Sequence, residues 1–342
     1  MNFGMFTDFH VRNGMSQAEA FDESFAQVME AEHLGFDTVW LAEHHFSPER
    51  AVLASPMVIA SALAARTERI RVGLAVQVLP LTNPLRVAEE AATVDHISKG
   101  RFDFGIGRSG LTRYYQGYNV PYSESRPRFL EALNVIMKAW QNEKFSYDGD
   151  YHSFHDVTVV PRPYQQPYPP VRVAVAGEET FPLIGRMGHP IFVSANTPKD
   201  ELKARVAAYG EGLAASGHKG PGDIAVRVPV YVAETTEKAR SEPKGSAMSA
   251  IQYTARELSQ TAATEELAER MRQAAAAPYE DVLRDRVVFG TPEEVTDRLK
   301  AFQDDFGATG VVMEMNFGGQ IACERVNNSM RLLAEKVMPH FK

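Results

Sequence analysis

The sequence predicts an α/β fold, a single (β/α)₈ barrel of the TIM type with two insertions, on three observations. Short runs of β-branched and aromatic residues alternate with longer amphipathic runs along all 342 residues. The predicted strands are almost continuously apolar, which is typical of parallel sheets covered on both faces. No stretch rich in Pro, Gly and Ser divides the chain, so one domain spanning residues 1–342 is expected.

The first half of the chain supplies the boundaries of four strand–helix units. Ser16 and Glu19 form a capping box at the start of the first helix, and Gly35 ends it. Pro56 and Pro84 occupy the first turns of the next two helices. We therefore expect strands at 2–6, 37–42, 70–78 and 101–107, and helices at 16–35, 55–67, 83–100 and 123–141.

The second half repeats the unit with two interruptions. Asp148-Gly149 supplies the turn of a hairpin insertion over 145–163, and a second insertion over 235–286 is mostly helical in period. The other expected elements are strands at 170–177, 189–195, 223–234 and 310–319, and helices at 178–188, 199–217, 291–307 and 321–337. A doubly wound open sheet is the alternative, but FTDFHVRNG lacks the glycine-rich turn that such folds favour after the first strand.

The composition argues against several classes of protein. A chain with 44% hydrophobic and 23% charged residues is typical of soluble globular proteins, and its net charge of −8 disfavours nucleic-acid binding. The single cysteine, Cys323, leaves no internal disulfide and fits a reducing compartment. Neither a secretion signal nor an apolar run long enough to cross a membrane is found, so a cytoplasmic location is expected.

Polar and glycine-rich residues gather where the predicted strands end, which is the face on which barrel enzymes build their active sites. GIGRSG, 105–110, brings backbone N–H groups and a guanidinium to one strand end, and AGEET, 176–180, leads into a helix. Together they predict a phosphate site. Its expected members are Arg108, the backbone of Ala176 and Gly177, and the Thr180 hydroxyl. A tight turn with a solvated arginine is the alternative, since GxGxxG alone is a weak signal.

The stretch FDTVWLAEHHF ends a predicted strand on Glu43, His44 and His45. Adjacent residues at a strand end point in opposite directions, so the two histidines would not easily share a metal, and no metal is expected. One imidazole is expected to face the barrel mouth as a general base or hydrogen-bond donor, with Glu43 fixing a ring or forming an ion pair. Two histidines that bond only to neighbouring backbone are the alternative.

A series of longer strings resembles the bacterial luciferase-like, flavin-dependent monooxygenases, and in particular the α-subunit type of alkanal monooxygenase. The strings are FDTVWLAEHHF, SPMVIASALAARTERIRVGLAVQVLPLTNPLRVAEEAATVDHISKGRFDFGIGRSG, PVRVAVAGEET, VVFGTPEEV and ATGVVMEMNFGG. The resemblance implies a barrel that binds reduced FMN delivered by a separate flavin reductase. It implies that the flavin reacts with O₂ to form a C4a-hydroperoxide, which oxygenates a small organic substrate.

The resemblance also assigns roles to the residues at the first strand ends. The family's catalytic histidine matches His44, and His45 and Glu43 support it. A non-proline cis peptide under the flavin ring matches Ala75-Val76. A dimer, either homodimer or heterodimer, is implied through helices near 55–66 and 84–98.

The phosphate site of the family falls on the same residues that the loops predict. Its arginine matches Arg108, and its backbone and hydroxyl groups fall on Ala176, Gly177 and Thr180. A reactive cysteine often found just before the arginine is absent, because Gly107 occupies that place. Its absence puts thiol-dependent tuning of the reaction in doubt, but not flavin binding.

Two expectations concern the mouth of the barrel. The insertion 235–286 is expected to act as a mobile lid that keeps the flavin dry, and a surface helical pair without a gating role is the alternative. Phe6, Phe9 and Phe317 are expected either to line an apolar substrate pocket or to belong to the core, and Trp40 is assigned to the core.

Two other functions share this barrel. One is hydride transfer that depends on the deazaflavin F420, which the closeness of EHHF and FDFGIGR to the luciferase α pattern disfavours. The other is a non-catalytic flavin-binding partner subunit like the luciferase β chain. The presence of both His44 and Arg108 argues against that role.

Overall fold

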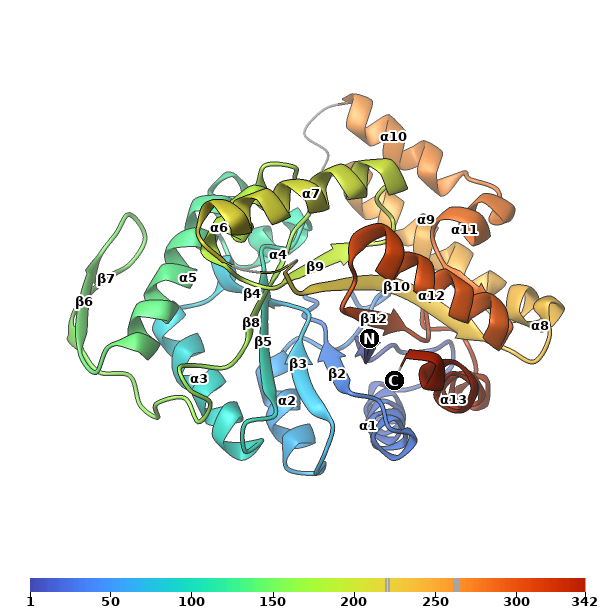
Figure 1. Cartoon of the computed structure of the whole chain (residues 1–342), viewed down its shortest axis with the longest axis horizontal. Helices are drawn as coiled ribbons and strands as arrows, with labels where there is room; N and C mark the ends of the chain where they lie inside the picture. The colour runs from blue at the N-terminus through green and yellow to red at the C-terminus, as the bar shows by residue number, and fades with distance from the viewer. Residues whose placement is uncertain (219, 221, 261–264, 342) are drawn as a thin grey trace. The chain divides into compact units, whose positions relative to one another are not determined.

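The computed structural model describes residues 1–218, 220, 222–260 and 265–341, and the chain divides into two compact units. Unit 1 comprises Met1–Trp40, Ser47–Val52 and Val175–Lys342, and unit 2 comprises Leu41–Phe46 and Leu53–Ala174. Parallel strands alternate with helices along the chain in both units (Figure 1). This is the (β/α)₈ barrel class that the sequence predicts, whereas the prediction of one domain spanning the whole chain stays a prediction.

The strands of unit 1 pair in parallel with a register that places functional side chains together. The strands are β1 (Asn2–Thr7), β9 (Ile191–Ser194), β10 (Ile224–Val232), β11 (Val288–Gly290) and β12 (Gly310–Glu314), and β2 (Thr38–Leu41) begins in this unit. β12 pairs with both β1 and β10, and β10 also pairs with β9 and β11. Phe6 lies opposite Glu314, and Arg227 lies opposite Val312. Through this pairing the Arg227 side chain, in the middle of β10, contacts Glu314 at the end of β12 and the ring of Phe6 on β1.

The helices of unit 1 begin and end largely as the sequence predicts. They are α1 (Gln17–Leu34), α6 (Thr180–Met187), α7 (Lys199–Ala215), α8 (Thr236–Ser241), α9 (Lys244–Gln260), α10 (Glu265–Ala275), α11 (Tyr279–Asp285), α12 (Pro292–Phe306) and α13 (Cys323–Leu332). Ser16 and Glu19 form the expected capping box at α1, and Gly35 ends the helix with a φ of 87°. Helices α8 to α11 make up the insertion 235–286, of which residues 261–264 lie outside the described part.

Unit 2 contains the strands and helices of the middle of the barrel and the predicted hairpin. They are α2 (Pro56–Ala64), β3 (Arg71–Leu74), β4 (Gln77–Val78), α3 (Pro84–Ile97), β5 (Phe102–Gly107), α4 (Thr112–Gly117), α5 (Ser125–Gln141), β6 (Phe145–Asp148), β7 (Ser153–Val157) and β8 (Val171–Ala174). β5 pairs with β3, β4 and β8, and the antiparallel hairpin β6–β7 extends beside α5 (Figure 1).

Several elements differ from the sequence-based expectation, and one of them is the strand β11, which was not predicted. The strand expected over 70–78 is interrupted between β3 and β4 by a cis peptide at Ala75–Val76. The strand expected over 310–319 ends at Glu314, because Gly318 and Gly319 turn the chain with φ values of 88° and 74°. The short helix α4 was not predicted.

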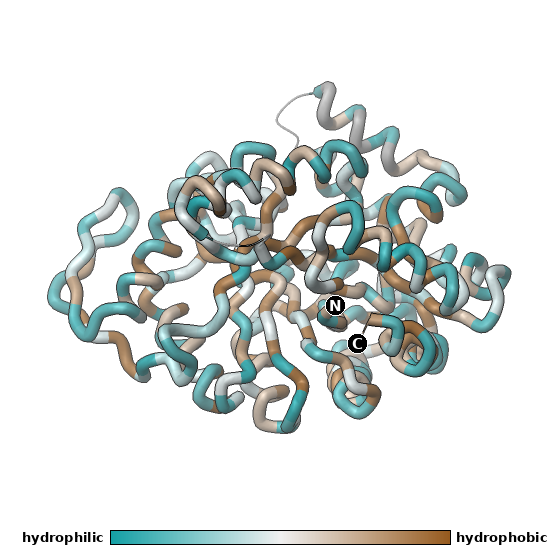
Figure 2. The backbone as a smooth tube through the Cα atoms, in the orientation of Figure 1, coloured by the Kyte–Doolittle hydropathy of each residue, from teal (hydrophilic) through white to brown (hydrophobic). Residues whose placement is uncertain are grey.

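Apolar residues concentrate on the strands of each unit, and the helices carry mixed faces (Figure 2). Trp40 is buried and packs edge-on against Phe192 with ring centres 4.9 Å apart, which confirms its assignment to the core. Phe9 is also core, because it packs against Phe21 and Phe25 of α1. Among the described helices, none is both long and apolar enough to span a membrane.

Helices α6 and α7 approach so closely that glycines are required at their contact. A Cβ atom added to Gly212 of α7 would lie 2.4 Å from the carbonyl oxygen of Pro182, and one added to Gly185 of α6 would lie 2.3 Å from that of Tyr209. Gly210, two residues before Gly212 in the same helix, would meet nothing within 4 Å.

The Gly212→Ala variant should therefore lower the free energy of unfolding by about 1–3 kcal/mol, because the added methyl group forces the helices apart. The matched variant Gly210→Ala should raise the free energy of unfolding by about 0.5–1 kcal/mol, because it lowers the conformational entropy of the unfolded helix. Denaturant unfolding followed by circular dichroism measures both. Equal effects of the two substitutions would show that this helix contact is not tightly packed.

Candidate active site

Glu43 is a buried carboxylate that follows β2 and accepts three hydrogen bonds. Its Oε2 atom accepts from the side-chain amide of Gln77 at 2.7 Å and from the backbone N–H of Val78 at 2.9 Å. Its Oε1 atom lies 2.8 Å from Nε2 of His45. Because a buried carboxylate needs such partners to remain charged, Glu43 links the end of β2 to β4.

His45 is held between two partners that set its proton position. With Nε2 donating to Glu43, Nδ1 accepts a hydrogen bond from the Tyr118 hydroxyl at 3.2 Å. Burial and the nearby Glu43 charge raise the pKa of Tyr118, which keeps this hydroxyl protonated as a donor. The arrangement agrees with the expectation that Glu43 fixes one of the two imidazole rings.

His44 has a different partner and is only half-buried. Its Nδ1 atom lies 2.7 Å from the hydroxyl of Tyr114, a fully buried residue of α4, and its backbone N–H donates to Leu53. This contact orients the ring, and the second nitrogen, Nε2, is the other position at which the imidazole can hold a proton. The two adjacent histidines thus have different hydrogen-bond partners, although both rings contact the ring of Tyr114.

Arg108 follows β5 and is fixed at both its side chain and its backbone. The guanidinium is half-buried and donates from Nη1 to the Ser125 hydroxyl at 3.0 Å, at the first residue of α5. The Tyr115 hydroxyl donates to the Arg108 carbonyl oxygen, and burial, with a smaller contribution from Tyr122, raises the pKa of Tyr115. The guanidinium of Arg108 is therefore held in a fixed orientation next to the N-terminus of α5.

Gly107 lies against the cis peptide and has no room for a side chain. A Cβ atom at this position would lie 2.6 Å from Cγ2 of Val76. The expectation of a cis peptide at Ala75–Val76 is confirmed. Without a movement of Val76, the side chain of a cysteine at position 107 would clash with it.

The remaining predicted residues of the phosphate site lie in unit 1. Ala176 is exposed and its carbonyl oxygen accepts a hydrogen bond from Arg205 at 2.8 Å. Thr180 is the first residue of α6, and its N–H donates to the carbonyl oxygen of Gly177 at 2.9 Å. Their predicted role beside Arg108 of unit 2 stays a prediction.

Other features of unit 1 lie apart from the predicted site residues. Within the described part of the chain, the group of three side chains placed to share a metal ion is Asp8, His10 and Glu314, so it contains neither His44 nor His45. A cavity of about 580 Å³ is lined by the loop after β9, the start of α7, the end of α11 and one face of α12. No predicted site residue lines this cavity.

The apolar pocket expected from Phe6, Phe9 and Phe317 does not form as one group. Phe9 packs into α1, as described above, and Phe6 is buried beneath the guanidinium of Arg227. Phe317 packs against the apolar cluster of the insertion, formed by Ile251, Val282 and Val287.

Sequence reasoning missed four side chains that orient the predicted ones. They are Tyr114 and Tyr118, which contact the histidines, Gln77, which contacts Glu43, and Ser125, which contacts Arg108. The string TRYYQGY, directly after GIGRSG, was the available signal for the two tyrosines. The pattern of this string does not distinguish tyrosines that contact a site from tyrosines on an ordinary surface helix.

Comparison with known proteins identifies the family. Residues 1–309 match the family described as luciferase-like monooxygenase, and the chain belongs to this family. It is 32% identical over 218 residues to the alkanal monooxygenase alpha chain of Photorhabdus luminescens, which covers 64% of this chain and 60% of the relative. It is also 30% identical over 285 residues to the F420-dependent glucose-6-phosphate dehydrogenase of Kineococcus radiotolerans, covering 81% and 82% of the two chains.

Solved structures share the fold over the whole chain. The monooxygenase RslO1 from Streptomyces bottropensis matches with a TM-score of 0.84 and 27% identity, covering 100% of both chains. The oxygenating constituent of 3,6-diketocamphane monooxygenase from Pseudomonas putida, solved in complex with FMN, matches with a TM-score of 0.81. Its identity is 18% and it covers 99% of this chain and 98% of its own, so this likeness concerns the fold alone. The chain spans about half the length of two of the curated relatives that it matches.

The two tyrosine contacts predict separate spectroscopic signatures for the two histidines. In Tyr114→Phe, the ¹⁵N signal of His44 Nδ1 should shift, because its hydroxyl partner at 2.7 Å is removed, while the His45 signals stay in place. In the matched variant Tyr118→Phe, the Nδ1 signal of His45 should shift instead. Imidazole ¹⁵N spectra of the unliganded protein measure both, and a shift of the same ring in both variants would contradict the assignment.

Proposed function

We propose that this protein is the oxygenating component of a two-component monooxygenase, which binds reduced FMN supplied by a separate flavin reductase. With O₂ it would oxygenate a small organic substrate. The observation that supports this most is the placement, within unit 2, of an oriented imidazole, His44, and a preset guanidinium, Arg108, at strand ends. Membership in the luciferase-like monooxygenase family supports the same chemistry.

The donor groups around Arg108 suit the phosphate of FMN. The guanidinium uses one donor on Ser125, and its remaining N–H groups match the oxygens of a phosphate monoester. Ser125 begins α5, whose N-terminal N–H groups favour an anion. Ala176, Gly177 and Thr180 are proposed to add backbone and hydroxyl contacts to the same phosphate.

Reduced FMN, when bound, supplies the two electrons with which O₂ is activated. His44 is proposed to hold and transfer a proton at the reacting centre, with its ring direction set by Tyr114. Glu43 and His45 support this position from the neighbouring side of the strand end. Ala75, Val76 and Gly107 are proposed to let the backbone approach the flavin ring closely.

The insertion 235–286 is proposed to act as a lid that excludes water from the bound flavin. Helix α9 is joined to the loop after β12 through Ser246, whose hydroxyl donates to the carbonyl oxygen of Phe317 at 2.7 Å. The backbone N–H of Gln320 donates back to the Ser246 hydroxyl at 2.9 Å. A lid attached at the end of β12 is well placed to respond to a ligand at the strand ends.

A dimer through α2 and α3 is also proposed, either of two copies or with a related chain. Val58 on α2 is 66% exposed and Ile97 on α3 is 38% exposed, so both helices carry apolar residues on their outer faces. Such residues are the kind that a subunit interface buries.

F420-dependent hydride transfer is the second candidate, because a relative of 30% identity that matches over most of its length is F420-dependent. Anaerobic fluorescence titration with reduced FMN and with reduced F420 distinguishes the two. The proposal predicts saturable binding of reduced FMN and weak or no binding of F420. Binding of reduced F420 without binding of FMN would overturn it.

Arg108→Ala should weaken the binding of reduced FMN by about 1.5–3 kcal/mol, the usual value of a charged hydrogen bond. The matched variant Arg113→Ala, whose guanidinium donates to the Phe46 carbonyl oxygen on the surface, should bind FMN as the wild type does. Equilibrium titration measures both constants. An unchanged affinity in Arg108→Ala would place the phosphate elsewhere.

His44→Ala should retain the binding of reduced FMN and lose coupling, so that O₂ is released as H₂O₂ rather than transferred to the substrate. His96→Ala, which removes an exposed imidazole bonded to the Arg162 carbonyl oxygen, serves as the control and should remain coupled. Peroxide formed per NADH consumed, with a reductase present, is the measurement. Wild-type product yield in His44→Ala would refute the role of this imidazole.

A further inference from the structure

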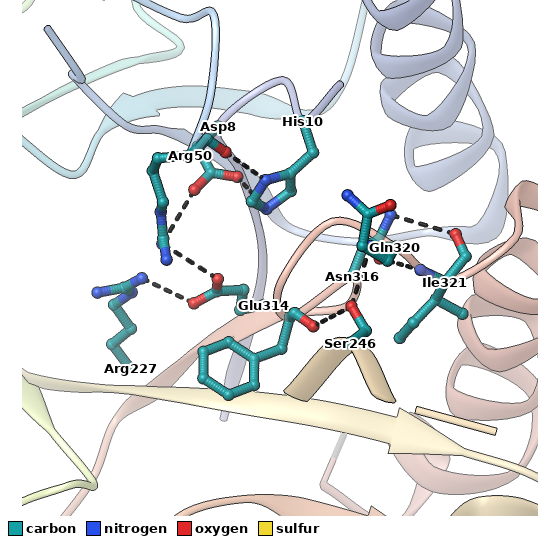
Figure 3. A network of polar contacts seen from close by, with 10 residues as sticks. Asp8, His10, Arg50, Arg227, Ser246, Glu314, Asn316, Gln320 and Ile321 are labelled. Carbon is teal, nitrogen blue, oxygen red and sulfur yellow. Dashed lines mark hydrogen bonds and ion pairs between the residues drawn. The ribbon is translucent and has the colours of Figure 1, made fainter. Parts of the chain in front are cut away.

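Five charged side chains form one network at the carboxyl ends of β1 and β12 and beside the middle of β10 (Figure 3). They are Asp8, His10, Arg50, Arg227 and Glu314, all in unit 1. Arg50 bridges the two carboxylates, with Nη2 3.0 Å from Asp8 and 3.3 Å from Glu314. His10 lies 2.6 Å from Asp8, and Arg227 lies 2.7 Å from Glu314.

Both ring nitrogens of His10 face an oxygen atom. Its Nδ1 atom lies 2.7 Å from the carbonyl oxygen of Arg50, which can only accept a hydrogen bond, so Nδ1 is the donor. Its Nε2 atom lies 2.6 Å from a carboxylate oxygen of Asp8, a separation that requires a proton between them. Burial lowers the pKa of His10, but the Asp8 carboxylate outweighs it, so the pKa is raised above its ordinary value.

The network therefore contains three basic side chains and two carboxyl groups. The side chains of His10 and Arg50 are each 11% exposed, and those of Asp8 and Glu314 are 1% and 4% exposed. The side chain of Arg227 is 40% exposed. The excess positive charge of the network thus reaches solvent at Arg227.

Arg227 is held in one orientation with donors to spare. Its guanidinium lies over the ring of Phe6, 4.3 Å from the ring centre, and Glu314 fixes one edge through Nη2. Its Nε–H group is buried and bonds to no described residue. A buried donor without a partner is costly, and a flat, oriented guanidinium with open N–H groups matches the two oxygens of a carboxylate.

We propose that Arg227, in the middle of β10, anchors an anion site that binds the carboxylate of a small organic acid beside the ends of β1 and β12. These strand ends form the face on which barrel enzymes bind their substrates. Binding of the carboxylate does not depend on the flavin chemistry. The further claim that this acid is the substrate that is oxygenated rests on the proposed function.

A cation is disfavoured at the same place, although Asp8, His10 and Glu314 bring ligand atoms within 4.8 Å of one another. The oxygens of both carboxylates already face Arg50, His10 or Arg227. A metal ion would need to displace these positive groups and to deprotonate His10.

Benzoate and its neutral isostere benzamide test the proposal on the full-length, flavin-free protein. Isothermal titration at low salt should give an affinity for benzoate about tenfold higher than that for benzamide, the size of one charged hydrogen bond. In ¹H–¹⁵N spectra, benzoate should shift the Arg227 Nε–H signal, which is assigned by its absence in Arg227→Lys. Equal affinities for the two probes, or an unmoved Nε–H signal, would overturn the proposal without any destabilising variant.

Three variants locate the site. Arg227→Gln should abolish the preference for benzoate, and the matched control Arg256→Gln, which removes an exposed guanidinium paired with Glu49, should retain it. Loss of the preference in Arg108→Ala but not in Arg227→Gln would assign the carboxylate to the predicted phosphate site and overturn the proposal. The titration with reduced FMN decides the proposed function separately, since failure to bind FMN leaves the benzoate result unaffected.

Discussion

The geometry of the candidate site depends on one buried carboxylate, that of Glu43. Its three hydrogen bonds, from Gln77, from the backbone of Val78 and from His45, satisfy a charge that would otherwise be costly in the interior. They also fix the end of β2 against β4 and hold the His45 ring. Between Glu43 and His45 in the chain lies His44, whose Nδ1 atom faces the Tyr114 hydroxyl.

Each unit contains charged side chains near strand ends, and the partners of these side chains differ between the two units. Unit 2 pairs a single carboxylate with neutral donors and a histidine that needs only one proton. Unit 1 pairs two carboxylates with two guanidiniums and an imidazole.

Local signals explain how much of this was predictable. The capping residues Ser16, Glu19 and Gly35 predicted where α1 begins and ends. The apolar strand runs predicted the class of fold. The Asp148-Gly149 turn predicted the hairpin. The EHH string predicted a carboxylate that fixes one imidazole ring, and Glu43 contacts His45 in this way. The expected opposite directions of the two histidines stay a prediction, because both rings contact Tyr114.

What could not be predicted depends on contacts between distant residues. Arg227 lies in a strand that reads as ordinary β sequence, and its partner Glu314 is 87 residues away. Tyr114 meets His44 across 70 residues through a short helix without a periodic signal. Phe9 suggested a pocket, but its positive φ turns the chain so that the ring packs into α1.

The central claim, oxygenation with reduced FMN, is tested most directly with labelled oxygen. The protein is incubated with FMN, NADH, a flavin reductase and ¹⁸O₂ against aldehydes, sulfur compounds and small carboxylic acids, and products are identified by mass. The account predicts a product carrying one ¹⁸O atom whose formation requires FMN. A product that carries no ¹⁸O, or one that forms equally without FMN, would contradict it.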